Sequence, residues 1–90
     1  MKKQTSKAKE AIYKIIENQI KDNEPQEVKI TLDRLISEGK SEEEAINLIG
    51  CALSAEMFEV LKHNTPYNKS RYVSYLNNLP EMPWEEWVFS

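Results

Sequence analysis

Residues 41–63, SEEEAINLIGCALSAEMFEVLKH, decide the fold of this chain of 90 residues. Apolar side chains recur around most of the helical circumference of this stretch, a pattern typical of a helix that is packed on several sides. Its start is marked by Ser41 and Glu44, whose spacing is that of a capping box. We therefore expect a central apolar helix over about 41–63, with the other elements packed around it.

Three further segments show helical periodicity, and none shows the alternation of a strand. They cover about residues 5–21, 25–38 and 69–78, with Pro25 as the first residue of the second helix and Gly39 just beyond its end. The connections are short, so consecutive helices are expected to pack as antiparallel neighbours. The pattern predicts an all-α fold, a small four-helix bundle-like domain. The expected buried face of the second helix is Val28, Leu32, Leu35 and Ile36.

The length and composition fit a single all-helical domain over residues 1–90, with a frayed basic start at 1–5 and a tail at 80–90. A cysteine count of 1 excludes an intrachain disulfide framework and a four-cysteine zinc site. Only 2 glycines argue against a glycine-rich phosphate loop. We expect a cytoplasmic protein with a reduced thiol, and no cofactor.

The charge is unevenly placed along the chain, although the formal net charge is only -3. All charged residues among the first nine are lysines, so the rest of the chain is strongly acidic. An acidic body repels phosphate, so we expect no nucleic-acid partner, and we interpret the lysines as a solvated helix start. No apolar run is long enough to span a bilayer, so we expect no membrane partner either.

Two groups of carboxylates on the central helix are candidates for a role in binding or chemistry. Glu56 lies on an otherwise apolar face, so it must lie at the rim of the core, have a partner, or hold a proton. Glu56, Glu59 and His63 share one face and are weak candidates for metal ligands, but the chain has a single histidine. Residues 42–44 are all glutamate and are interpreted as helix capping, with a charge-driven partner site as the alternative.

The C-terminal tail is the best candidate for binding. Trp84, Trp87 and Phe89 concentrate a large apolar area, which is typical of an interface with a partner protein or a second copy. The alternative is that the tail folds back and closes the end of the bundle. The main hypothesis is a protein-interaction or structural module without catalytic activity. The alternative is a metal-dependent or acid/base enzyme that uses carboxylates on facing helices.

Several short motifs resemble, in their order and spacing, a bacterial domain-of-unknown-function family of small all-helical proteins. The resemblance covers about residues 10–80 and implies a compact all-α domain, with no established activity. The motifs are Glu17-Asn18-Gln19, Pro25-x-Glu27-Val28, Thr31-Leu32-x-Arg34-Leu35, Glu38-Gly39, Glu44-Ala45-Ile46, Ile49-Gly50, Glu56-x-Phe58-Glu59 and Pro66-Tyr67.

The resemblance also has an implication for four polar residues, Tyr13, Glu17, Asn47 and Glu56. Relatives often carry histidines at the positions of Tyr13 and Asn47, which would lie near Glu17 and Glu56 and would point to a metal site. This chain has tyrosine and asparagine there, and both are poor ligands for zinc or iron. We therefore expect these four residues to form a buried, hydrogen-bonded polar cluster.

Overall fold

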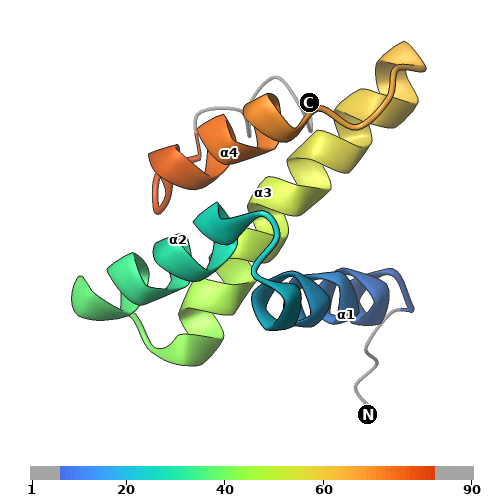
Figure 1. Cartoon of the computed structure of the whole chain (residues 1–90). Coiled ribbons are helices and arrows are strands. Elements are labelled where there is room, and N and C mark those ends of the chain that lie inside the picture. Colours follow the sequence, from blue (N-terminus) through green and yellow to red (C-terminus); the bar gives the residue numbers. More distant parts are fainter. Residues whose placement is uncertain (1–6, 83–90) are drawn as a thin grey trace, which may run out of the picture.

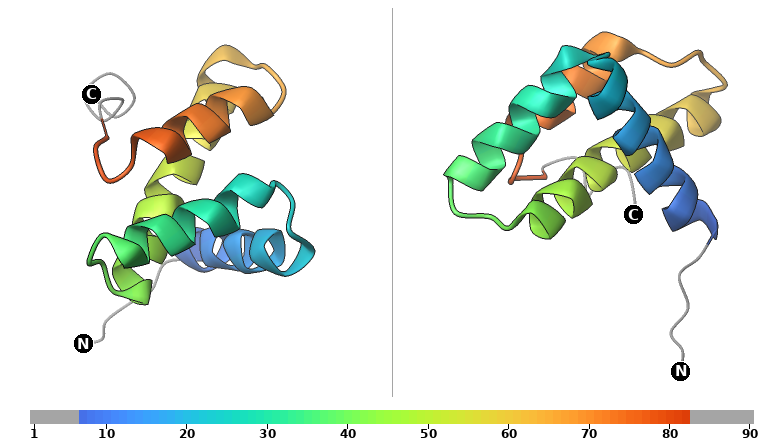
Figure 2. Two further views of the ribbon diagram at one scale, coloured as in Figure 1. Left: turned by 60° about the vertical axis from the view of Figure 1, so that its left-hand side comes forward. Right: turned by 60° about the horizontal axis from the view of Figure 1, so that its bottom comes forward.

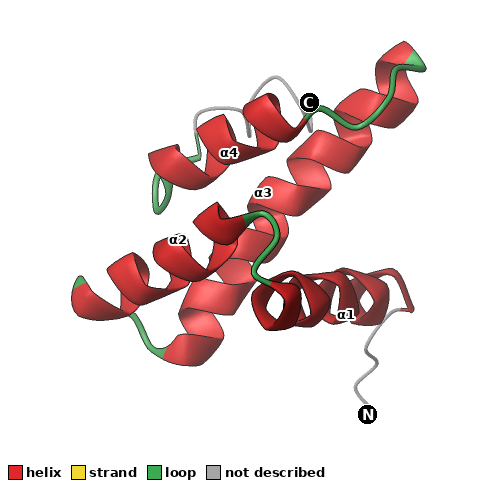
Figure 3. Ribbon diagram, in the orientation of Figure 1, coloured by secondary structure: helices red, strands yellow, loops and turns green. Residues whose placement is uncertain are grey.

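The computed structural model of the protein describes residues 7–82. Within this range the chain folds into helices joined by short loops, which confirms the all-α class (Figure 3). The basic start and the aromatic tail, with Trp84, Trp87 and Phe89, lie largely outside the described residues. The helices are α1 (Lys7–Asp22), α2 (Gln26–Ser37), α3 (Glu42–His63) and α4 (Lys69–Asn78).

The longest helix, α3, is the central element that the sequence predicts. It packs against each of the other three helices, while α2 also contacts α1 and α4. In Figures 1 and 2, α1 crosses the N-terminal half of α3, and α4 runs back along its C-terminal half. Within residues 7–82, no helix combines the length and the apolarity that crossing a lipid bilayer requires. The largest apolar side chains that are fully buried are Ile16, Val28, Leu35, Ile49, Tyr72, Leu76 and Leu79.

The helix ends form where the sequence places capping residues. Ser41 and Glu44 make the expected capping box, in which each side chain accepts a hydrogen bond from the backbone N–H of the other residue. Asn68 caps α4 by accepting from the N–H of Arg71. After α2, Gly39 adopts a φ of 106° and closes a Schellman turn with the carbonyl groups of the last helical turn.

Three details differ from the sequence-based expectation. Pro25 is the N-cap of α2 rather than its first helical residue, because its ψ of 142° is extended. Ile36 is 42% exposed, since it lies at the end of α2. The apolar surface of α3 is not buried along its whole length, and Leu61 is 81% exposed. On this face α1 covers Gly50, but the helix continues beyond the reach of α1.

Replacement by alanine is expected to have opposite effects on stability at the two glycines. A Cβ at Gly50 would lie 3.5 Å from Ile12 Cγ2, which is ordinary van der Waals contact. Gly50→Ala should therefore stabilise α3 by about 0.5–1 kcal/mol, because alanine has the higher helix propensity. Gly39→Ala should cost about 1–2 kcal/mol, because its positive φ strains any side chain.

Urea denaturation of the full-length chain measures both effects. Because Gly39 has no heavy atom within 4 Å of its added Cβ, a loss of stability there reports on the backbone alone. A destabilised Gly50→Ala variant would show that α1 and α3 cannot accommodate one more methyl group at their crossing.

Candidate functional site

A groove of about 300 Å³ lies between α1 and the start of α3. The two helices meet at an angle in Figure 2, and the groove occupies one side of their crossing. Its walls combine aliphatic, amide, phenol and carboxylate groups. The lining residues are Tyr13, Ile16, Glu17, Ile20, Glu42, Glu43, Ile46 and Asn47.

Helical spacing brings these side chains to the groove. Tyr13 and Glu17 are one turn apart on α1, and Glu43 and Asn47 are one turn apart on α3. Residues four positions apart share a helix face, so each helix presents a short ladder of polar groups. The hydroxyl group of Tyr13 donates a hydrogen bond to Oδ1 of Asn47 and so ties the two walls together.

The floor of the groove is aliphatic. Ile16 is fully buried in the core, whereas Ile20 and Ile46 pack against the core and keep part of their surface accessible. Partly exposed isoleucines beside a concave surface provide apolar area that a partner can cover. The groove is therefore an extension of the core surface, opened between two helices.

The rim of the groove is acidic, because Glu17, Glu42 and Glu43 are all exposed lining residues. Within residues 7–82, none of these three carboxylates has an ion-pair partner. The three glutamates predicted to cap the helix therefore have two different roles. Glu44 completes the capping box with Ser41, whereas the two glutamates before it, Glu42 and Glu43, line the groove.

Glu56 occupies a different environment, in the contact between α3 and α4. Its side chain is fully buried, and both of its oxygens accept hydrogen bonds. Arg71 donates from Nε to Oε1 at 2.6 Å and from Nη2 to Oε2 at 2.9 Å. The backbone N–H of Asn68 donates to Oε2 at 2.7 Å. Both donors belong to the start of α4, so this carboxylate anchors the first turn of α4 on α3.

The structure thus places the four predicted polar residues in two sites. Tyr13, Glu17 and Asn47 line the groove, whereas Glu56 bonds to the start of α4. Asn47 and Glu56 are nine residues apart on α3, which is about 13 Å along the helix axis. They also project toward different neighbours, α1 and α4 respectively.

The predicted metal ligands are engaged within their own helix and with α4. His63 Nε2 lies 3.2 Å from Glu59 Oε1, and the histidine side chain is more than half exposed. Glu56 is bound to Arg71 as described above. Across the described part of the chain, no three His, Cys, Asp or Glu side chains are arranged to hold a metal ion.

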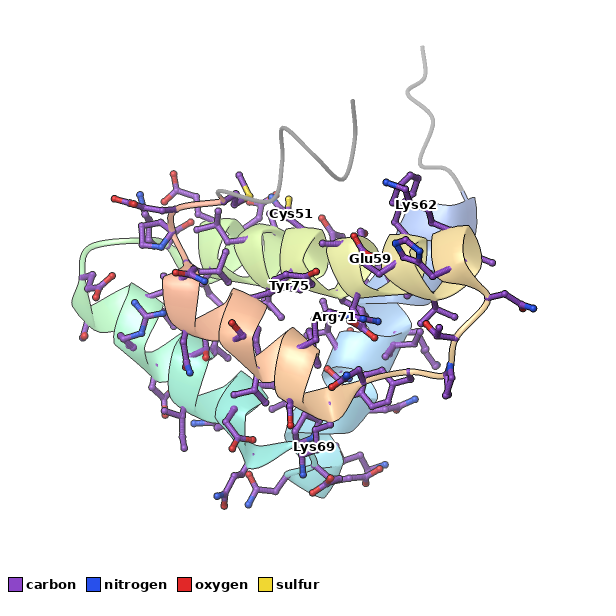
Figure 4. The ribbon with its side chains drawn as sticks, turned by 90° about the horizontal axis from the view of Figure 1, so that it is seen from above. Cys51, Glu59, Lys62, Lys69, Arg71 and Tyr75 are labelled. Atoms are coloured by element: carbon purple, nitrogen blue, oxygen red, sulfur yellow. The ribbon has the colours of Figure 1, made fainter. Side chains whose placement is uncertain are left out.

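The sequence alone does not identify Arg71 as the partner of Glu56. A buried acid on an apolar face requires a cation, and the first turn of α4 offers two, Lys69 and Arg71. Figure 4 shows Arg71 on the side of α4 that faces α3, with Lys69 directed away from α3. Lys69 instead pairs with Glu24 at 2.9 Å. Which of these two basic residues reaches Glu56 depends on how α4 is rotated about its axis, and the spacing of residues in the sequence does not reveal that rotation.

A second buried polar contact joins α4 to α1. The hydroxyl group of Tyr72 donates a hydrogen bond to Oε1 of Gln19 at 2.9 Å, and the tyrosine is fully buried. Burial raises the pKa of this hydroxyl above its ordinary value of 10.0, and the charge of Tyr67 acts in the same direction. The neutral phenol is therefore the form that the folded protein holds.

No family model, curated protein or solved structure matches the chain. The resemblance to a family of small helical proteins therefore stays a prediction. Function has to be argued from the chemistry of the surfaces that residues 7–82 present, and the groove between α1 and α3 is a concave surface that combines apolar and charged groups.

Removing the partner of Glu56 should destabilise the fold. Arg71→Met is expected to cost about 3 kcal/mol, because it leaves a buried carboxylate without its counter-charge. Lys69→Met removes a basic residue from the same turn, but its partner Glu24 is exposed, so we expect little change. Urea denaturation of both variants provides the comparison. Equal, small losses would mean that water can replace the guanidinium group beside Glu56.

The buried Tyr72 hydroxyl should make stability depend on alkaline pH. Its folded-state pKa is raised, so its contribution is complete below about pH 10 and is lost as pH rises toward the folded-state pKa. Tyr72→Phe should flatten this alkaline loss, whereas Tyr67→Phe, with a half-exposed ring, should retain it. Denaturation midpoints measured between about pH 9 and 11.5 test this. Parallel curves for all three proteins would contradict it.

Proposed function

We propose that this chain is a protein-interaction module and that the groove between α1 and α3 is its binding surface. The observation that carries the proposal is the pairing of an aliphatic floor, Ile20 and Ile46, with a rim of unpaired carboxylates. Protein interfaces commonly have an apolar centre and a polar rim. The groove has this composition on a small scale.

The size of the groove favours side chains of a protein over an enclosed small ligand. A volume of about 300 Å³ is at the lower end of the range for small-molecule pockets. It suits one or two anchoring side chains, which is how interfaces concentrate their binding energy. The rest of a partner's contact would extend over the neighbouring faces of α1 and α3.

The groove belongs to a frame that is held by contacts elsewhere. Arg71 and Glu56 fix α4 on α3, while Tyr72 and Gln19 fix α4 on α1. The hydrogen bond from Tyr13 to Asn47 joins the two walls of the groove itself. A surface that is already ordered loses little conformational entropy on binding, which favours its use in recognition.

The cellular setting and the tail complete the proposal. We propose a cytoplasmic location, because a chain with 1 cysteine gains no intrachain disulfide from an oxidising compartment. Partner binding or self-association through Trp84, Trp87 and Phe89 is a separate proposal, since those residues lie outside the described ones.

Selection of peptides from a random phage-displayed library tests the function without a known partner. The full-length chain serves as bait, and the selected peptides are measured against Ile20→Ser and Ile46→Ser. We expect each substitution to weaken binding about tenfold, because it removes apolar surface from the floor of the groove. Circular dichroism and thermal melting establish that each variant is folded.

Ile30→Ser is the matched control, because Ile30 is 58% exposed on α2 and does not line the groove. Binding to this variant should equal binding to the native chain. Selected peptides whose affinity falls for Ile30→Ser, but not for the two groove variants, would assign recognition to another surface and reject the groove.

A further inference from the structure

We propose that the groove between α1 and α3 binds a basic segment of a partner protein, in which lysine or arginine side chains flank aliphatic anchors. This inference rests on the proposed function, and it adds the chemical class of the partner. It follows from three properties of the groove: the sign of its charge, the availability of its carboxylates, and the apolar surface between them.

The charge of the groove is of one sign. Among the described residues that line it, Glu17, Glu42 and Glu43 are acidic, and none is basic. The carboxylates come from two helices, so negative charge borders the groove on both walls. A cation that enters between α1 and α3 approaches carboxylates from two sides, which strengthens and orients the encounter.

The carboxylates of the groove are not engaged by a cation of the described chain. Some exposed acids elsewhere in the described chain do form ion pairs, and their charge is already compensated. Such pairs join Lys29 to Asp33, Arg34 to Glu38 and Lys69 to Glu24. The acids of the groove have no such cation within residues 7–82. A partner can therefore supply it without displacing an existing contact.

The aliphatic floor selects a long basic side chain rather than a compact ion. Lysine and arginine lay their apolar stems along hydrophobic surface and extend their charged ends toward polar groups. Ile20 and Ile46 provide that surface, and the glutamates lie at its border. A metal ion needs a closer cluster of donors than residues 7–82 provide. The combination fits a basic and aliphatic protein segment.

The same arrangement disfavours acidic partners. An acidic segment would bring like charges together over the apolar floor, and like-charge contacts weaken a wrong complex. The groove is therefore expected to attract basic segments and to repel acidic ones. Affinity should accordingly fall from a basic peptide to a neutral peptide to an acidic peptide.

Three short amphipathic peptides with one leucine pattern test the order. Their polar positions are all lysine, all glutamine or all glutamate, and each peptide is titrated into the ¹⁵N-labelled full-length chain. The lysine peptide should shift the amide signals of Ile20, Ile46 and Asn47 and should bind about tenfold more tightly than the glutamine peptide. Raising the salt concentration should reduce that advantage, because exposed charges are screened.

A triple variant tests whether the groove carboxylates cause the preference. Glu17→Gln, Glu42→Gln and Glu43→Gln together should lower the affinity for the lysine peptide about tenfold and leave the glutamine peptide unaffected. These side chains are exposed and lie outside the hydrogen bonds between helices, so the variant should remain folded.

A second triple variant with the same change in net charge is the control. Glu10→Gln, Glu38→Gln and Glu81→Gln remove three carboxylates that do not line the groove. The lysine peptide should bind this variant nearly as well as it binds the native chain. Equal losses in the two triple variants would mean that only the net charge matters, and would overturn the inference.

Other outcomes separate the inference from the proposed function. Equal binding of all three peptides, weakened by Ile46→Ser, would leave the interaction module standing and remove the basic partner. Shifts confined to residues outside the groove would reject both. Concentration-dependent shifts of the chain alone, abolished by the groove triple variant, would assign the groove to a second copy and overturn a basic partner protein.

Discussion

The pairing of Glu56 with Arg71 is the interaction on which the rest of the structure depends. A fully buried carboxylate tolerates few environments, and here three hydrogen bonds from the start of α4 satisfy it. Moving α4 by one turn, about 5.4 Å, would separate these donors from the acid. The pair therefore fixes the position of α4, and with it the buried side chains Tyr72 and Leu76 that complete the core.

The central helix uses the same residue type in two opposite ways. At its start, Glu42 and Glu43 are exposed and favoured by the positive end of the helix dipole. Four turns further on, Glu56 is enclosed and requires a cation and a backbone donor. The exposed acids are available for recognition because they have no structural partner in the described chain. The enclosed acid is committed to structure for the opposite reason. Whether a glutamate of α3 borders the groove or holds the helices together is therefore decided by its burial and its partners, not by its residue type.

Local signals made most of the fold predictable. Ser41 and Gly39 mark helix ends through their own hydrogen bonding or backbone freedom, and the structure confirms both; Asn68 caps α4 in the same way as Ser41 caps α3. Periodicity identified the central helix, but it could not tell that Leu61 is 81% exposed, because coverage depends on the lengths and angles of neighbouring helices. The partner of Glu56 could not be predicted either, because it also depends on how the helices are arranged. Its identity follows from the rotation of α4, a tertiary property that no local pattern records.

The absence of the groove glutamates from the interhelical contacts of residues 7–82 has an evolutionary consequence. Substitutions at Glu17, Glu42 and Glu43 break no hydrogen bond or ion pair between described helices, and those at Glu42 and Glu43 lose only the modest stabilisation by the helix dipole, so these positions can drift while the scaffold stays the same. Lysine at the same three positions would reverse the sign of the groove and with it the sign of the charge that the groove attracts. Chains with one fold and divergent partners can arise in this way, since the residues that hold the helices and those that border the groove are different residues.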